Sequence, residues 1–255
     1  MAKYNVHAGH NPDGKKACGA VGLIKESTEA RKVKNLVIKY LKAQGHTVYD
    51  CTVNDGTSAS DVLKKIIEKC NAHDVDLDIS IHFNSGANNK QGDEKTTGTE
   101  VLIYSNTSKA KDEATRICKK IASLGFKNRG VKVREELYVL RKTEAPALLV
   151  ECCFVDDKDD IKLYDVNKMA KAIAEGILNK TITEKKSFKS YLVKVANVKK
   201  GDVLNIRAEP NVFARINGTL KYNDTNSYTI VDEKNGWGKL KSNVGWIKLS
   251  YTKKV

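Results

Sequence analysis

Two histidines and two glutamates have the residue types and positions that metal-dependent hydrolysis requires. His10 and His82 each follow a strand-like segment, Glu26 lies at the start of a helical segment, and Glu151 closes the apolar run Ala147–Val150. Two imidazoles and one carboxylate suit a catalytic zinc ion (Zn2+), because they leave a fourth position open for water. A further carboxylate beside that water can move protons as general base and acid. The pattern therefore indicates a zinc-dependent hydrolase.

Each of these residues also has an ordinary structural explanation. A histidine after a strand is more often a hydrogen-bonded loop residue than a ligand, and Glu26 near a helix N-terminus complements the helix dipole. Glu29, one turn later, competes with Glu26 for the same metal position. Glu151 is harder to explain in this way, because a carboxylate among apolar neighbours is costly to bury without a partner. Spacing alone leaves both interpretations open.

Strands alternate with helices through the first 180 residues, as judged from alternating or β-branched segments and from apolar residues at helical spacing. The expected strands are Tyr4–Val6, His46–Cys51, Leu77–His82, Thr99–Tyr104 and Ala147–Glu151. The expected helices begin at a cap on Ser27 or Thr28 and on Ser58 or Ser60, cover Lys109–Leu124, and occupy two stretches within Asp156–Leu178. This order predicts an α/β fold with a mostly parallel, twisted sheet and helices on both faces. Loop residues at the carboxyl edge of such a sheet meet in its ligand crevice.

The chain changes character after residue 180. Residues 181–187 are polar and charged, as in a linker, and no helical periodicity is found in residues 188–255. Short strands between Gly and Asn turns are expected at Leu192–Val195, Leu204–Arg207, Tyr228–Val231, Gly236–Leu240 and Gly245–Lys248. We therefore predict two domains, residues 1–180 and 188–255, and the second is expected to be a small all-β barrel.

Positive charge is concentrated in the second part. The formal net charge is +14, from 45 Lys+Arg against 31 Asp+Glu, and residues 185–255 contribute 15 of the bases but only 5 of the acids. This part should be attracted to a polyanion, for which nucleic acid, an anionic membrane and an anionic cell wall all qualify. No apolar stretch approaches the ~20 residues of a membrane span. The six cysteines form no CxxC pair, so we expect reduced, buried thiols.

Four motifs in order resemble those of zinc N-acetylmuramoyl-L-alanine amidases of the Amidase_3 type, found in bacterial autolysins and in phage endolysins of Gram-positive (clostridial) hosts. They are spread over nearly all of residues 1–180. The motifs are Gly9-His10, Gly22-Leu23-Ile24-Lys25-Glu26, Ser80-Ile81-His82-Phe83-Asn84 and Pro146-Ala147-Leu148-Leu149-Val150-Glu151 followed by Phe154. Gly98-Thr99-Glu100-Val101 and Asn128-Arg129-Gly130-Val131 support them.

The resemblance implies roles for individual residues. His10, Glu26 and His82 would hold zinc, and Glu151 would be the catalytic general base and acid. Asn84 and Arg141 would contact substrate, although Arg141 can equally be a surface cation. The substrate would be the amide between N-acetylmuramic acid and L-alanine in peptidoglycan. The chain departs from the family at His7-Ala8, where many members have Asp-Pro; His7 either orients a ligand or ends the strand.

The C-terminal part resembles bacterial SH3-like wall-binding domains. The stretches that carry the resemblance are Leu204-Asn205-Ile206-Arg207-Ala208-Glu209-Pro210 and Gly236-Trp237-Gly238-Lys239. It implies binding to peptidoglycan and anionic wall polymers rather than to nucleic acid, with Trp237 as a contact and at least one of Trp237 and Trp246 in the barrel core. A start at Met169 would release this part as a free module.

The first residues show no signal peptide, so we expect synthesis in the cytoplasm and action at the bacterial cell wall after release, as an endolysin or autolysin. Three alternatives remain open. They are a basic nucleic-acid-binding protein, a wall-binding protein without catalysis, and a peptidase acting elsewhere in peptidoglycan.

Overall fold

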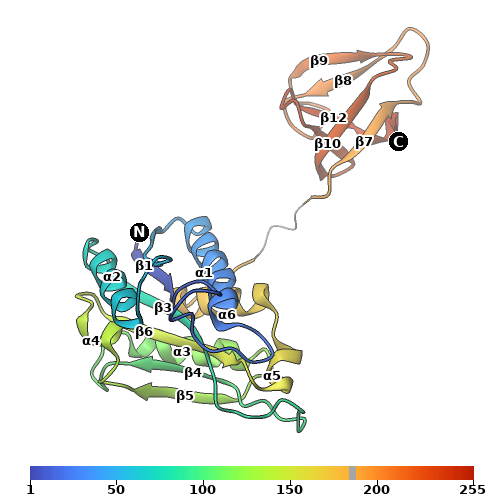
Figure 1. Ribbon diagram of the computed structural model, residues 1–255. Helices are drawn as coiled ribbons and strands as arrows, with labels where there is room; N and C mark the ends of the chain where they lie inside the picture. The colour runs from blue at the N-terminus through green and yellow to red at the C-terminus, as the bar shows by residue number, and fades with distance from the viewer. Residues whose placement is uncertain (184–187) are drawn as a thin grey trace. The chain divides into compact units, whose positions relative to one another are not determined.

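The computed structural model describes residues 1–183 and 188–255, which form two compact units, Met1–Ile182 and Thr183–Val255. Each unit is described by itself below (Figure 1). Residues 184–187, which make up most of the predicted linker 181–187, lie outside the described residues.

A six-stranded mixed sheet forms the centre of the first unit. Its strands follow the order β2-β1-β3-β6-β4-β5. They are β1 (Lys3–Ala8), β2 (Thr47–Asp50), β3 (Leu77–Asn84), β4 (Thr99–Ile103), β5 (Asn128–Val133) and β6 (Ala147–Phe154). Neighbouring strands are parallel except β4 and β6, which pair antiparallel. The predicted α/β class with a parallel-rich sheet is confirmed, and β5 is a strand that the pattern did not predict.

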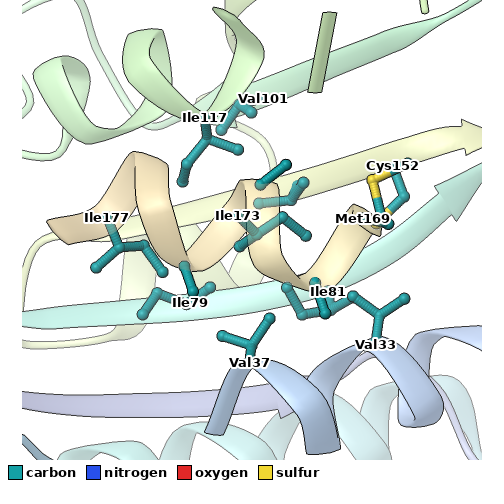
Figure 2. Packing of buried hydrophobic residues seen from close by; sticks show 14 of the residues in the cluster. Val33, Val37, Ile79, Ile81, Val101, Ile117, Cys152, Met169, Ile173 and Ile177 are labelled. Carbon is teal, nitrogen blue, oxygen red and sulfur yellow. The ribbon is translucent and has the colours of Figure 1, made fainter. Parts of the chain in front are cut away.

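Helices cover both faces of this sheet. The helices are α1 (Glu26–Ala43), α2 (Ala59–Asn71), α3 (Lys111–Ala122), α4 (Tyr138–Lys142), α5 (Lys158–Leu163) and α6 (Val166–Leu178). Residues of α1, α3 and α6 share one large apolar cluster with the sheet, and residues of α2 and α4 share a second, smaller one. Figure 2 shows α6 in the larger cluster, with Ile173 close to Ile117 on one side and Ile79 on the other.

The helix starts agree with the predictions in one case and differ in another. Ser58 caps α2 by accepting a hydrogen bond from the Asp61 backbone N–H at 3.1 Å, as predicted. The prediction of a Ser27 or Thr28 cap for the first helix was wrong, because α1 already begins at Glu26 and Ser27 is buried inside its first turn. Helix α1 has no side-chain cap, and the Glu26 carboxylate in its first turn makes its hydrogen bonds with residues outside the helix.

Strand β6 runs three residues further than expected. It continues through Cys152, Cys153 and Phe154, all of which are buried, so Glu151 lies inside the strand and does not end it. The apolar side chains after Glu151 supply the burial that keeps the chain extended and paired with β3. As a result, the carboxylate is fixed by strand pairing on both sides.

The second unit is a seven-stranded antiparallel sheet in the order β13-β7-β10-β11-β12-β8-β9. Its strands are β7 (Tyr191–Val195), β8 (Val203–Arg207), β9 (Ile216–Lys221), β10 (Ser227–Lys234), β11 (Trp237–Leu240), β12 (Trp246–Lys248) and β13 (Thr252–Lys254). Strands β9 and β13 were not predicted. A small core that includes Val193, Ile230 and Ile247 holds the sheet together. In neither unit do the described residues contain a helix long and apolar enough to cross a membrane.

Candidate metal centre and active site

The candidate site lies at the carboxyl ends of β1 and β3. The chain leaves β1 through α1 to β2 on one side, and then passes through α2 to β3 on the other side of β1. Such a reversal of strand order opens a crevice at the carboxyl edge of a sheet. His10 follows β1 by two residues and His82 lies near the end of β3, so the topology brings both imidazoles to this crevice.

The Glu26 carboxylate joins the two histidines. Its Oε1 lies 2.9 Å from Nδ1 of His82 and 3.2 Å from Nε2 of His10. One ligand atom from each of the three side chains lies within 4.8 Å of the other two. These side chains therefore form a group that can hold a metal ion, and it is the group expected from the sequence. Glu29, the rival carboxylate, instead accepts from Lys32 and from the Tyr164 hydroxyl.

Backbone groups hold the Glu26 side chain in place. Its Oε2 accepts from the Ala20 N–H at 2.8 Å, and its Oε1 accepts from the Phe83 N–H at 3.2 Å. Gly19 closes over it with a positive φ of 78°, and a Cβ there would come within 2.5 Å of Oε2. Burial by itself raises the pKa of Glu26, but the hydrogen bonds with His10 and His82 outweigh it and leave the pKa well below its ordinary value. Glu26 is thus an ionised carboxylate, as a metal ligand must be.

His10 has a backbone conformation that is uncommon outside glycine. Its φ is 63°, in the left-handed region, and such geometry at a non-glycine residue persists only where the surroundings enforce it. Arg31 of α1 provides that support. Its guanidinium donates to the His10 carbonyl at 2.9 Å and to the Val53 carbonyl at 2.9 Å. It also bonds the Asn54 side chain, so the loop after β1 is tied to the loop after β2.

The glycine before His10 is needed for space. A Cβ at Gly9 would lie 2.0 to 2.7 Å from three atoms of the His82 ring. Its N–H donates to the Ile81 carbonyl at 3.0 Å, which extends the pairing of β1 and β3 up to the site. The Gly-His pair therefore lets the His82 imidazole lie against the backbone of the neighbouring loop.

Glu151 lies beside His82 on the neighbouring strand. The two residues are register partners in the parallel pairing of β3 with β6. Within the described part of the chain, its Oε2 is shielded from solvent and has no hydrogen-bond partner. Burial, followed by the nearby charges of Glu26 and Glu100, raises the pKa of Glu151 well above its ordinary value. A buried carboxyl that readily holds a proton next to a metal-binding group is the arrangement that general acid–base catalysis requires.

A second carboxylate organises the other side of Glu151. Glu100 is its register partner on β4. The Glu100 Oε1 accepts from the Asn84 side chain at 3.1 Å, and Oε2 accepts from the Arg129 guanidinium at 2.8 Å. Arg129 also lies over the Phe154 ring, 5.0 Å from its centre. Asn84 is therefore held at the end of β3, two residues from His82, by a carboxylate that is itself fixed.

Comparison with known proteins identifies the first unit. Residues 5–182 match the N-acetylmuramoyl-L-alanine amidase family (Amidase_3). The chain belongs to this amidase family. The solved catalytic domain of the CD27L endolysin, which targets Clostridia difficile, is similar to it at 30% identity with a TM-score of 0.64, over 72% of this chain and all of that one. The amidase AmiC2 of Nostoc punctiforme is similar at 27% identity with a TM-score of 0.57, over 70% and 96% of the two chains.

The relatives found by sequence are longer than the part of each that matches this chain. An uncharacterised protein of Clostridium perfringens (strain 13 / Type A) is 36% identical over 220 residues, which cover 82% of this chain and 63% of that protein. A second Clostridium perfringens protein is matched over 46% of its length, so the chain spans only part of these relatives. The endolysin of Bacillus phage SPP1 is 33% identical over 196 residues, 71% of this chain and 67% of that protein.

Two residues expected to contact substrate are not among the three side chains of the metal-binding group. Arg141 is exposed on α4, with its guanidinium 5.8 Å from the centre of the Tyr138 ring. Trp237 belongs to the second unit, where it is 5% exposed at the start of β11. The roles of both residues stay predictions.

The candidate site also contains residues that the sequence did not single out. Arg31 follows Glu26 by five positions and resembles an ordinary surface cation of an amphipathic helix, so nothing in the pattern marked it. Glu100 and Arg129 lie in the two supporting motifs, which is the feature of the sequence that could have identified them as site residues. Their ion pair joins β4 to β5, two strands whose pairing the sequence did not predict.

Proposed function

We propose that the protein is a peptidoglycan hydrolase that cleaves the amide between N-acetylmuramic acid and L-alanine, and that it acts as an endolysin or autolysin. The observation that carries this proposal is the convergence of His10 and His82 on one oxygen of Glu26, next to the buried, unpaired carboxyl of Glu151. Membership of the amidase family supports the choice of bond. The rival class of basic nucleic-acid-binding proteins gives no reason for this group of residues.

The metal that suits this group is zinc, held by His10, Glu26 and His82. Two imidazole nitrogens and a carboxylate oxygen are a donor set typical of catalytic zinc sites, and the lowered pKa of Glu26 keeps its carboxylate ionised. When bound, zinc polarises a carbonyl oxygen and lowers the pKa of a water molecule. The remaining tasks belong to the side chains around it.

Glu151 is the residue proposed to move the proton. Its shielded Oε2 can accept a proton from the attacking water, and its raised pKa allows it to keep that proton until the leaving nitrogen takes it. Asn84 is proposed to orient the substrate, since Glu100 holds its side chain and prevents free rotation. Arg141 is proposed as a more distant substrate contact.

Fragment analysis tests this function directly. Purified peptidoglycan is digested with the full-length protein, with and without a chelator and with zinc restored, and the products are identified by mass spectrometry. We expect stem peptides with a free L-alanine amine, loss of release with chelator, and about one zinc per chain. Cleavage between two amino acids would instead show a peptidase. Protein that contains no zinc, but that binds DNA of arbitrary sequence in a salt-sensitive way in a gel mobility assay, would favour the nucleic-acid-binding alternative.

For the second unit we propose an SH3-like wall-binding domain that recognises anionic wall polymers. An open groove of about 590 Å³ lies in this unit, with Trp237 and Tyr251 among its walls. Lys199, Arg207 and Lys248 line it together with one acid, Asp202, so a negatively charged ligand is favoured. The Lys248 amine lies 5.4 Å from the centre of the Trp237 ring, which keeps a cation beside a flat apolar surface.

Charge reversal tests the groove. Lys199→Glu with Lys248→Glu, in the full chain, should weaken sedimentation with purified walls. Lys221→Glu with Lys234→Glu, two exposed positions outside the groove, changes the net charge equally and is the matched control. Equal loss for the control would mean that net charge alone drives binding. If the groove variant loses as much binding to walls stripped of phosphate polymers as to intact walls, the ligand of the groove is peptidoglycan itself.

An internal start at Met169, which we propose as the source of a free second unit, would divide helix α6 from the amidase core. Met169 is fully buried in α6, so a product that starts there would carry most of this helix without the amidase core. The apolar side chains of Ile173 and Ile177 would then be exposed. A smaller product that disappears in a Met169→Leu variant would support the internal start, and an unchanged single band in both would remove it.

A further inference from the structure

A small cavity adjoins the candidate metal centre on the side of α2. Its volume is about 90 Å³, and His10 and His82 both line it. A site for one water molecule needs about 10–15 Å³ of such volume, so the cavity has room for a short side chain. Because the two imidazoles form part of its wall, a group next to a bond that reacts at the metal centre can reach into it.

The wall facing the sheet is mainly aliphatic. Val62, Leu63 and Ile66 of α2 line the cavity, with Val139 of α4. Ala59, at the first turn of α2, lies at its exposed end. Such a wall favours a methyl or methylene group over a charged one.

The opposite, deep end carries one polar atom without a partner. His7 lines the cavity and is only 1% exposed. Its Nδ1 lies 3.4 Å from the Ser80 hydroxyl, and its Nε2 has no hydrogen-bond partner among the described residues. A buried ring nitrogen left unpaired is costly, so it points to a ligand atom or a bound water at this position.

We propose that this cavity is the subsite for the side chain of the first stem-peptide residue, the amino acid on the amine side of the scissile amide. The assignment rests on the proposed amidase function. An aliphatic wall with a single polar end fits a methyl group with a water on His7 Nε2, or a hydroxymethyl group that replaces this water. The lactyl methyl on the other side of the bond carries no atom that can reach His7, so it fits the cavity less well.

The proposal predicts a narrow side-chain preference. Substrates whose first stem-peptide residue is L-alanine or L-serine should have similar kcat/KM values. A substrate with glycine at this position should have a kcat/KM at least about tenfold lower, because an apolar pocket gains about that factor when one methyl position is filled. A bulky first residue such as L-leucine should react poorly. Replacing lactyl by glycolyl should have little effect.

Two variants link this preference to the cavity. Ala59→Leu narrows the exposed end and should reduce the preference for L-alanine over glycine, and Lys64→Ala, exposed on the same helix, should leave it unchanged. His7→Phe removes the polar atom and should lower activity on L-serine relative to L-alanine, and His7→Gln should restore part of this ratio. Ratios between substrates are compared within each variant, so a general loss of folded enzyme does not imitate the effect.

The results separate the subsite from the activity. Hydrolysis of the L-alanine substrate with equal rates for glycine would overturn the subsite and leave the amidase function intact; the cavity would then hold only water. Sensitivity to glycolyl but not to glycine would assign the cavity to the lactyl methyl and overturn the proposal. No release from any muramoyl substrate by zinc-loaded protein would reject the proposed function itself.

Discussion

The two faces of the six-stranded sheet bury different kinds of side chain. The face under α1, α3 and α6 is covered by a large cluster in which Ile79 and Ile81 of β3 are fully buried (Figure 2). The alternate residues of the same strand, Asp78, Ser80 and His82, point to the face under α2 and α4, where the apolar cluster is smaller. One strand therefore supplies the apolar core on one side and polar groups on the other.

The difference shows how this fold separates stability from chemistry. The face under α1, α3 and α6 is closed by apolar packing, so changes there should act on the free energy of unfolding. The face under α2 and α4 is left partly open near the carboxyl ends of the strands, where His82, Glu151 and Glu100 are neighbours. Changes there should act mainly on activity, pH dependence or metal affinity.

The largest effect is expected for Glu151→Gln, on the open face. It removes the proposed proton carrier, so kcat should fall by about 10²- to 10⁴-fold. Zinc content should be retained, and the melting temperature should stay equal or rise, because a buried unpaired carboxyl becomes a neutral amide. Glu144→Gln, an exposed residue close in sequence, is the control. Loss of zinc together with activity would show that Glu151 is a ligand instead.

On the closed face, Ile173→Ala should lower the free energy of unfolding by about 2–5 kcal/mol, since it leaves a cavity between α6 and its neighbours. Chemical denaturation measures this loss. Activity per folded molecule should not change. Ile216→Ala, at a half-exposed position of the second unit, should cost much less. A large drop in kcat for Ile173→Ala would contradict the separation of the two faces.

Asp78, on the face under α2 and α4, should make stability depend on pH. Burial raises the pKa of Asp78 to about 6, and this outweighs the opposing contacts with Asn5 and Cys70. Between the ordinary pKa of about 4 and this value, the folded state holds a proton that the unfolded state has lost, so stability falls as pH rises. A shift of about two units corresponds to at most about 3 kcal/mol.

Asp78→Asn should make the free energy of unfolding depend less on pH between pH 4 and 6, and it should stabilise the protein above this range. Denaturant melts across pH measure both effects. Asp74→Asn, exposed in the preceding loop, should leave the curve of the wild type unchanged. A steeper fall for Asp78→Asn than for wild type would show that the charge is stabilised in the folded state.

The smallest of these effects is expected for Arg31→Lys. Lysine cannot span the carbonyls of His10 and Val53 that the guanidinium joins, so the His10 loop should lose its fixed conformation. Zinc affinity should weaken by about 10- to 100-fold, as for other residues that orient metal ligands. Chelator competition measures this, with Lys39→Ala on α1 as the control. Unchanged affinity would mean that the strained His10 backbone holds its shape without Arg31.

Much of the site was visible before the structure, because it depends on local pattern. His10, Glu26, His82 and Glu151 each lie at an element boundary or in an apolar run, and their order along the chain matches the family motifs. The start of the first helix was placed wrongly because the polar Glu26 and Ser27 already belong to it, and the end of β6 because the buried Cys152, Cys153 and Phe154 continue the strand. The β5, β9 and β13 strands were missed, since each is short or strongly polar.

By itself, the sequence determined the α/β alternation of the first part, and it predicted a two-part organisation and the residues of the candidate site, with Glu29 left as a rival to Glu26. Only the tertiary structure showed that Glu26, and not Glu29, contacts the histidines, since this contact joins His82 to a residue 56 positions away. Only it revealed the support of His10 by Arg31 and the cavity below His7. These depend on distances between segments that are remote in the chain, and no local periodicity encodes a distance of that kind.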